Sequence, residues 1–156
     1  TLYLVPLLDI QQKIMELIPD KYWVIFFRRA MIRIANIIAT KIDAVALVTG
    51  DSVGQVASQT LSNLRAVSDT SNLPILRPLS GMNKEDIINK AKLIQTYDIS
   101  VLPYEDCCSF FVPKHPETKA KMGDINKQDD KLNLDDLLAE VISNIEEIKM
   151  NYEGEK

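Results

Sequence analysis

The stretch AVALVTGDSVGQVASQT, residues 44–60, decides the fold predicted for this chain. Its first five residues are all apolar, which is typical of a strand covered on both faces, as in a parallel sheet. The strand stops at residues 49–52, TGDS, because Gly, Asp and Ser break strands and can cap a helix. A small polar helix is predicted from Gly54 onward. The stretch therefore predicts a strand, a tight loop and a helix in succession.

The loop between this strand and this helix is a candidate nucleotide or anion site. Ligands of open α/β sheets lie at the carboxyl ends of the strands, where a helix amino terminus offers free N–H groups and the positive end of its dipole. The residues predicted to lie there are Thr49, Gly50, Asp51 and Gln59. An ordinary βα turn produces the same pattern, and the pattern alone favours that turn, because short Gly-containing turns are common.

Strand-like and helix-like segments alternate along the rest of the chain. Strands are predicted at 2–5, 73–79 and 101–102, and amphipathic helices at 7–18, at 24–42 and from Asn83 onward. Asn83 is a good helix cap with Asp86 in the first turn, and Leu93 and Ile94 are expected to point inward. The alternation predicts an α/β fold, a parallel sheet with helices on both faces.

The last third of the chain has a different organisation. Residues 104–120 show no clear periodicity and are predicted to form a long ordered loop, which closes a domain spanning 1–122. A polar linker is expected at 123–131, an acidic amphipathic helix at 132–150 and a frayed tail at 151–156. A packing helix at the edge of the domain is the favoured interpretation of 132–150.

Composition excludes several classes of protein. The chain has 156 residues and a formal net charge of -4, so a wholly basic nucleic-acid binder is excluded, whereas a local basic patch is not. From Asp129 onward there are nine Asp or Glu residues and three Lys. No apolar stretch is long and clean enough to cross a membrane. The single histidine and the two adjacent cysteines exclude a disulfide framework and a self-contained His/Cys zinc site.

Three arginines interrupt the apolar helix predicted at 24–42. Arg29 and Arg33 are four residues apart and share a helix face, whereas Arg28 points elsewhere. Guanidinium groups suit phosphate oxygens, so contact with phosphate or RNA is one interpretation. A solvated stripe with local ion pairs is the other, and the pattern slightly favours it.

The adjacent cysteines, Cys107 and Cys108, lie in the predicted loop beside Glu105 and Asp106. A cysteine is a nucleophile only as its thiolate, and neighbouring carboxylates oppose thiolate formation. A buried, inert pair is therefore the commoner case. A reactive cysteine would need positive charge nearby, which the arginine helix or Lys114 could supply.

Five segments taken together resemble the C-terminal part of the ThiI-type tRNA sulfurtransferases, the tRNA 4-thiouridine synthetases, most closely those of Firmicutes. The segments are RRAMIRIA (28–35), ALVTGDSVGQVASQTLSNLR (46–65), LPILRPL (73–79), NKEDIINKAK (83–92) and TYDISVLPYEDCCSFFVPKHPETK (96–119). The resemblance runs from about residue 2 to residue 120, in order and almost without gaps. The acidic segment after residue 132 lies outside the well-matched part.

The resemblance implies a Rossmann-like fold of the PP-loop ATP pyrophosphatase type and a cytoplasmic enzyme. Such enzymes use ATP, with Mg²⁺ expected, to adenylate the 4-oxo group of a tRNA uridine, and sulfur from a cysteine desulfurase persulfide then replaces the adenylate. Some also supply sulfur for the thiamine thiazole, and a homodimer is a further expectation. The family's ATP-contacting positions correspond by motif to Arg28, Gly50 and Gln59 in this sequence. Asp51 lies beside Gly50 and is included in the same candidate site. Cys107, with Cys108 as the alternative, matches the sulfur-transfer cysteine.

Some family features are missing from this sequence. The Ser-Gly-Gly-x-Asp-Ser pyrophosphate loop and the RNA-binding THUMP module are absent, and we expect them upstream of Thr1 in a longer protein, so that the fold is truncated at its N-terminal strand and loop. Asp51 replaces the usual Glu. A catalytically inactive paralogue that binds or dimerises is the alternative, and a related transferase acting on a small molecule is a third interpretation.

Overall fold

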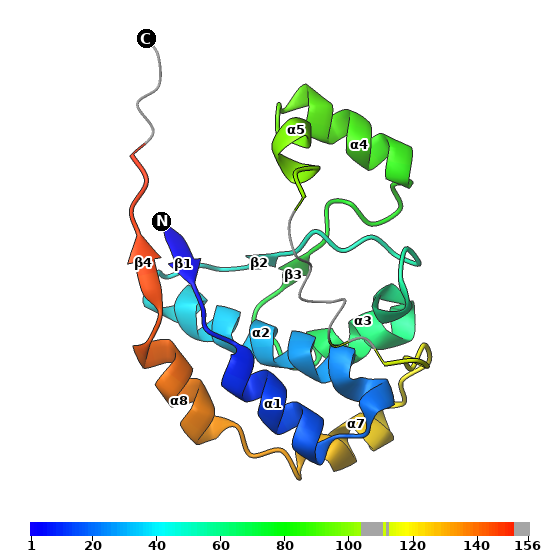
Figure 1. Cartoon of the computed structure of the whole chain (residues 1–156), viewed down its shortest axis with the longest axis vertical. Helices are drawn as coiled ribbons and strands as arrows, with labels where there is room; N and C mark the ends of the chain where they lie inside the picture. Colours follow the sequence, from blue (N-terminus) through cyan, green and yellow to red (C-terminus); the bar gives the residue numbers. More distant parts are fainter. Residues whose placement is uncertain (104–110, 112, 152–156) are drawn as a thin grey trace.

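A central helix, α2, organises the computed structural model, which describes residues 1–103, 111 and 113–151 (Figure 1). The helices are α1 (Leu8–Leu17), α2 (Trp23–Lys41), α3 (Leu61–Ser68), α4 (Lys84–Leu93), α5 (Tyr97–Ser100), α7 (Met122–Asp129) and α8 (Asp135–Ser143). The strands are β1 (Leu2–Leu4), β2 (Leu47–Val48), β3 (Ile75–Leu76) and β4 (Glu146–Ile148). Short 3-10 turns lie at Asp20–Tyr22 and Ala57–Gln59.

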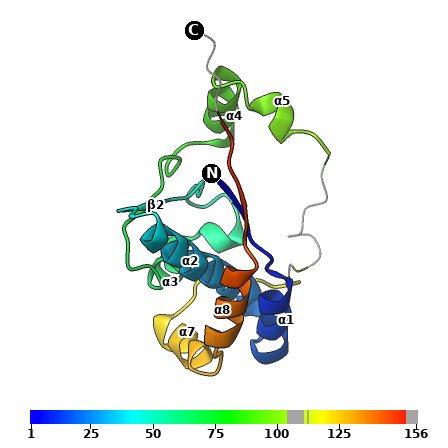
Figure 2. The same cartoon turned by 90° about the vertical axis from the view of Figure 1, so that its left-hand side faces the viewer.

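The hydrophobic core lies between α2 and the helices around it. Phe26 and Ile25 of α2 pack with Ile10 and Ile14 of α1, and all four are at most 2% exposed. Side chains of α3, α7 and α8 complete this core. Burial of an apolar stripe from each of these helices stabilises the helical body. Figure 2 shows α7 and α8 beside α1 on the lower side of that body, while α4 and α5 stand apart from it.

The predicted α/β fold with parallel strand pairing is confirmed. β2 and β3 pair in parallel, with Leu47 opposite Ile75 and Val48 opposite Leu76. Leu47 and Ile75 pack against the core below the pair. Helices α1 and α2 occupy the predicted positions to within one or two residues, and Asn83 and Asp86 form the capping box that opens α4.

The predicted burial of both faces of the 44–48 strand is wrong for this chain. β2 is only two residues long, and Val45 and Val48 are 82% and 68% exposed. Successive side chains of a strand point to opposite faces, so Val48 and Leu76 share the face that α2 does not cover. Leu93 and Ile94, expected to point inward, are also exposed, because α4 contacts mainly α5.

The helix predicted from Gly54 starts later than expected. Gly54 has a φ of +80°, which is not a right-handed helical conformation, and the chain forms the 3-10 turn Ala57–Gln59 before α3 begins at Leu61. Thr60 caps α3 by accepting the backbone N–H of Asn63. The predicted strand at 101–102 is also wrong. Val101 instead caps the short helix α5, and no strand lies beside it among the described residues.

Two further corrections concern the C-terminal third. Residues 122–129, expected to belong mostly to a polar linker, form α7, because Ile125 is fully buried in the core. The helix predicted over 132–150 ends with α8 at Ser143. The chain then forms β4, which pairs antiparallel with β1 so that Leu2 lies opposite Ile148. This pairing gives the backbone of both strands the hydrogen-bond partners that neither segment has alone.

Candidate nucleotide-binding site

Asp51 is the centre of a polar cluster at the end of β2. It is 5% exposed and follows the strand by three residues. Its Oδ2 accepts hydrogen bonds from the Thr49 hydroxyl at 2.8 Å and from Arg77 Nε at 3.2 Å. Its Oδ1 pairs with Arg28 Nη2 and lies 3.5 Å from Gln59 Nε2. The structure therefore brings together four of the five residues that the sequence predicted for this site, Arg28, Thr49, Asp51 and Gln59, and the fifth, Gly50, lies between Thr49 and Asp51 in the chain.

The geometry of the parallel strands explains how these residues meet. Asp51 and Arg77 follow β2 and β3, whose carboxyl ends lie at the same edge of the sheet. Arg28 comes from α2, the helix that packs beneath β2, and its Nη1 also donates to the Ser58 carbonyl at 3.2 Å. The sequence analysis did not single out Arg77. Its position directly after the second parallel strand is the signal that could have identified it.

The cluster carries an excess of positive charge. Burial by itself raises the pKa of the Asp51 carboxyl, but the Thr49 hydroxyl and the guanidinium groups of Arg28 and Arg77 outweigh that effect. The pKa of Asp51 therefore lies below its ordinary value, and the carboxylate is ionised at neutral pH. Two guanidinium groups share this one carboxylate, which leaves one net positive charge for an anionic ligand.

The residues beside this cluster fit an adenine nucleotide. Gln59 Oε1 is buried and accepts no hydrogen bond within the described residues. Because Gln59 Nε2 faces Asp51, this oxygen has no protein donor among the described residues, and a ligand N–H donor such as an adenine amino group reaches it only when the 57–59 turn or its neighbours move to expose it. Gly50 is exposed, and a Cβ placed there would meet no described atom within 4 Å. A ligand can therefore approach the backbone at Gly50 without obstruction.

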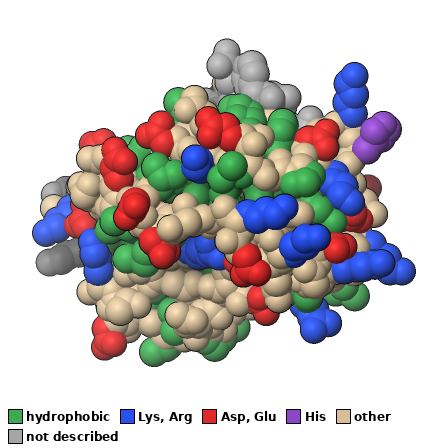
Figure 3. All heavy atoms as spheres, turned by 90° about the horizontal axis from the view of Figure 1, so that it is seen from below, with side chains coloured by type: hydrophobic (Ala, Val, Ile, Leu, Met, Phe, Trp, Pro, Cys, Tyr) green, Lys and Arg blue, Asp and Glu red, His purple; other side chains and the backbone are tan. Residues whose placement is uncertain are grey.

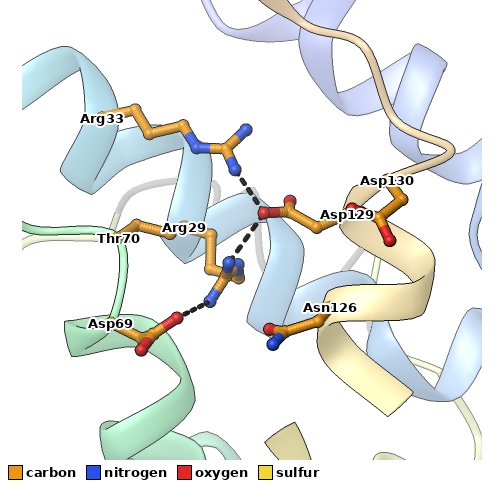
Figure 4. A pocket seen from close by; sticks show the side chains of 7 residues that line it. All are labelled: Arg29, Arg33, Asp69, Thr70, Asn126, Asp129 and Asp130. Atoms are coloured by element: carbon orange, nitrogen blue, oxygen red, sulfur yellow. Dashed lines mark hydrogen bonds and ion pairs between the residues drawn. The ribbon is translucent and has the colours of Figure 1, made fainter. Parts of the chain in front are cut away.

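The other two arginines of α2 form a separate ionic cluster. Asp129 Oδ2 of α7 accepts from Arg29 Nη2 at 2.8 Å and pairs with Arg33 Nη2, and Arg29 also lies 3.9 Å from the Asp69 carboxylate (Figure 4). These residues line an open pocket of about 370 Å³. The structure thus favours local ion pairs for Arg29 and Arg33. They hold α7 against α2, and they do not join the cluster around Asp51.

The predicted catalytic cysteines, Cys107 and Cys108, lie outside the described residues, so their role stays a prediction.

Figure 3 shows the face formed below α1, α7 and α8. Lysine and arginine side chains are interspersed there with aspartate and glutamate, so this face has no single-sign patch of the kind that marks a nucleic-acid footprint. Within the described residues, no helix is both long enough and apolar enough to cross a lipid bilayer.

The family model described as "Thiamine biosynthesis protein (ThiI)" matches residues 1–134. A probable tRNA sulfurtransferase of Acetivibrio thermocellus is 48% identical over 145 residues, covering 93% of this chain and 37% of that protein. One from Thermus thermophilus is 44% identical over 153 residues, covering 98% of this chain and 38% of that protein. The chain therefore spans little more than a third of the length of these curated relatives.

A solved structure is also similar over most of the chain. It is described as a 4-thiouridine synthetase–RNA complex with bound ATP, and it superposes with a TM-score of 0.87 at 42% identity. The match covers 92% of this chain and 38% of the solved chain. At this identity and TM-score the Rossmann-like fold is shared.

Proposed function

Because the chain belongs to the ThiI family, we propose that it forms the nucleotide-binding and cysteine-bearing part of an ATP-dependent tRNA sulfurtransferase. The observation that carries this proposal is the cluster of Arg28, Asp51, Arg77 and Gln59 beside the open backbone at Gly50. The cluster lies at the carboxyl edge of parallel strands, where α/β folds bind nucleotides. The bound ATP and RNA of the solved relative support ATP and tRNA as the substrates.

The residues of the cluster have distinct parts in this proposal. ATP, with Mg²⁺, supplies the adenylyl group that activates the 4-oxygen of a uridine. Arg28 and Arg77 supply the net positive charge that favours phosphate, and Asp51 fixes the orientation of both guanidinium groups. Gln59 Oε1 accepts a hydrogen bond from the adenine amino group, a donor that uracil and hypoxanthine lack. Gly50 leaves room for the nucleotide.

Sulfur transfer is assigned to the cysteine pair. Cys107, or Cys108 as the alternative, carries persulfide sulfur received from a cysteine desulfurase. The outer persulfide sulfur forms a bond to C4 of the activated uridine, the C4–O bond breaks, and AMP leaves with the original oxygen. A second thiol then loses its proton and attacks the cysteine sulfur, the S–S bond breaks with its electron pair on the sulfur of 4-thiouridine, and the two thiol sulfurs become a disulfide, which a thiol reductant reduces for the next turnover. Sulfur transfer for the thiamine thiazole is a second candidate function, which the description of the matching family favours.

Serine substitutions of the two cysteines test this proposal. The natural protein that carries this sequence is incubated with unmodified tRNA, ATP, Mg²⁺, cysteine, a cysteine desulfurase and a thiol reductant, and 4-thiouridine is measured by nucleoside mass spectrometry. We expect Cys107→Ser to abolish 4-thiouridine while ATP affinity stays unchanged, because the thiol carries the sulfur and the nucleotide site is intact. Cys108→Ser is the matched control.

Each outcome has a defined meaning. Loss of 4-thiouridine in Cys108→Ser alone would transfer the role to Cys108. Full activity in both variants would contradict the assignment of sulfur transfer to this pair. Absence of 4-thiouridine with the unsubstituted protein would contradict the proposed reaction itself and would bring the binding-module alternative forward.

A further inference from the structure

The segment PKHPETKAK, residues 113–121, carries positive charge that the proposed reaction does not yet use. It contains three lysines and one glutamate and is called the basic segment below. Lys114, Lys119 and Lys121 are all exposed, and within the described residues none of the three takes part in an ion pair. Although the chain is acidic overall, this stretch presents ammonium groups to solvent.

Buried residues fix the basic segment to the helical body. Pro113 and Ala120 are buried, and the Ala120 N–H donates to Asn63 Oδ1 at 3.1 Å. Lys119 and Lys121 flank Ala120, and the backbone of Lys121 is extended. Because successive side chains of an extended chain point to opposite sides, the burial of Ala120 directs both lysines toward solvent.

The single glutamate of the basic segment does not neutralise these lysines. Glu117 Oε1 accepts the Lys119 backbone N–H at 2.9 Å, and its Oε2 lies 3.4 Å from Lys21 Nζ. Lys21 therefore supplies the countercharge of Glu117. Among the described residues, no carboxylate lies within ion-pair distance of the ammonium groups of Lys114, Lys119 and Lys121.

The basic segment lies directly beside the candidate nucleotide site. Asn63 Nδ2 donates both to the Glu117 carbonyl at 2.6 Å and to the Ala57 carbonyl at 2.9 Å. Ala57 begins the 3-10 turn that belongs to the nucleotide cluster. Thr60, directly after this turn, donates its hydroxyl to the Thr118 carbonyl at 2.7 Å. One asparagine and one threonine thus join the backbone of the basic segment to the nucleotide-binding turn.

We propose that the basic segment binds the phosphate backbone of the tRNA through Lys114, Lys119 and Lys121. This inference rests on the proposed function, in which ATP and the tRNA must meet at one place. Lysine ammonium groups bind nucleic-acid phosphates irrespective of the base, so such contacts position the RNA and do not read its sequence. A basic segment held beside the nucleotide site meets that need.

Figure 3 agrees with this placement. His115, the only histidine of the sequence, is drawn in purple at the right-hand edge of that view, and lysine or arginine side chains lie above and below it. Positive charge therefore gathers at this edge, whereas the face as a whole carries both signs. The proposed RNA-binding surface is this edge, beside α3, and not the whole face below α1, α7 and α8.

Removal of the ammonium groups tests the proposal in the natural protein that carries this sequence. The dissociation constant for unmodified tRNA is measured by fluorescence anisotropy between about 50 and 300 mM KCl, without ATP. We expect Lys119→Gln/Lys121→Gln to weaken binding about tenfold or more near 100 mM salt. The slope of log K against log salt should fall by about 2, because about one counterion is released per phosphate contact, and Lys114→Gln should lower it by about 1 more. ATP affinity should stay unchanged.

Two double variants serve as controls. Lys84→Gln/Lys90→Gln removes the same charge from exposed lysines of α4, which stands apart from the helical body, and should leave tRNA affinity and slope unchanged. Lys119→Arg/Lys121→Arg keeps the charge of the basic segment and should retain both.

Three results would overturn the proposal. The first is an unchanged slope in Lys119→Gln/Lys121→Gln. The second is an equal loss in the α4 control, which would indicate attraction by net charge alone. The third is a loss of ATP affinity with unchanged tRNA binding, which would assign the lysines to the triphosphate. The proposed function fails separately, if the unsubstituted protein forms no 4-thiouridine.

Discussion

Asp51 is the residue that holds the candidate nucleotide site together. The sequence placed it after a strand, and the structure adds two guanidinium partners and a hydroxyl donor. An aspartate that is 5% exposed must be paired, since an isolated buried carboxylate is costly. Its two arginine partners come from α2 and from the end of β3, so one carboxylate connects three parts of the fold.

The ion pairs of Asp51 predict a pH-dependent effect of Asp51→Asn. Near pH 7 we expect the substitution to lower the free energy of unfolding by about 2–4 kcal/mol, because Arg28 and Arg77 lose their countercharge. The folded-state pKa lies below the ordinary value of 3.8, so this stabilisation is complete above pH 3.8 and is lost as the pH falls through the lowered pKa. Urea unfolding of both proteins between pH 7 and pH 2.5 measures the difference.

The control for this experiment is Asp43→Asn. Asp43 is exposed, and its φ of 55° is a conformation that asparagine tolerates equally well. We expect this control to leave stability unchanged within about 0.5 kcal/mol. A difference between Asp51→Asn and the unsubstituted protein that stays constant down to the acid limit would contradict the assigned ion pairs.

Helix α7 is an element that the sequence pattern did not predict. Its composition is polar, with a glycine in the first turn, and it carries few apolar residues. Ile125 nevertheless enters the core at 0% exposure, while Asp129, one turn later, accepts from Arg29 and Arg33. The helix is thus stabilised by tertiary contacts and not by its own periodicity.

Substitution of Ile125 tests the helical structure of this segment. We expect Ile125→Ala to lower the free energy of unfolding by about 2–5 kcal/mol, the usual cost of a cavity in a packed core. Leu93→Ala on α4 is the matched control, and because Leu93 is 80% exposed we expect a change below about 0.5 kcal/mol. Denaturant titration of the two variants compares them. A near-zero effect of Ile125→Ala would support the polar linker that the sequence suggested.

Local signals made part of this fold predictable. The apolar stripes of α1 and α2, the Asn83 capping box and the apolar run before Gly50 each depend on nearby residues alone. Strand β4 forms only by pairing with β1, which lies about 140 residues earlier in the chain. From the sequence alone, the apolar residues Ile145 and Ile148 are equally consistent with the end of a helix. Arg77 likewise acquires its role only from a segment that folding brings to it.

At the scale of the whole molecule, α2 connects the site to the helical body. Arg28 on one side of the helix contacts Asp51, whereas Arg29 and Arg33 on another side hold α7. The face of β2–β3 that carries Val48 and Leu76 stays exposed, although parallel sheets are usually covered on both faces. This exposed face belongs to a chain that spans 38% of the solved relative.

The most direct test of the nucleotide site is isothermal titration of ATP into the natural protein and two glycine variants. A Cβ at Gly50 meets no described atom within 4 Å and Gly50 is exposed, so we expect Gly50→Leu to fold normally while its side chain occupies the space proposed for the nucleotide. Gly123 on α7 is equally open and lies outside the cluster, which makes Gly123→Leu the control. We expect the unsubstituted protein and Gly123→Leu to bind ATP alike, and Gly50→Leu to lose binding at an unchanged melting temperature. ATP binding by Gly50→Leu as tight as that of the unsubstituted protein would contradict the site.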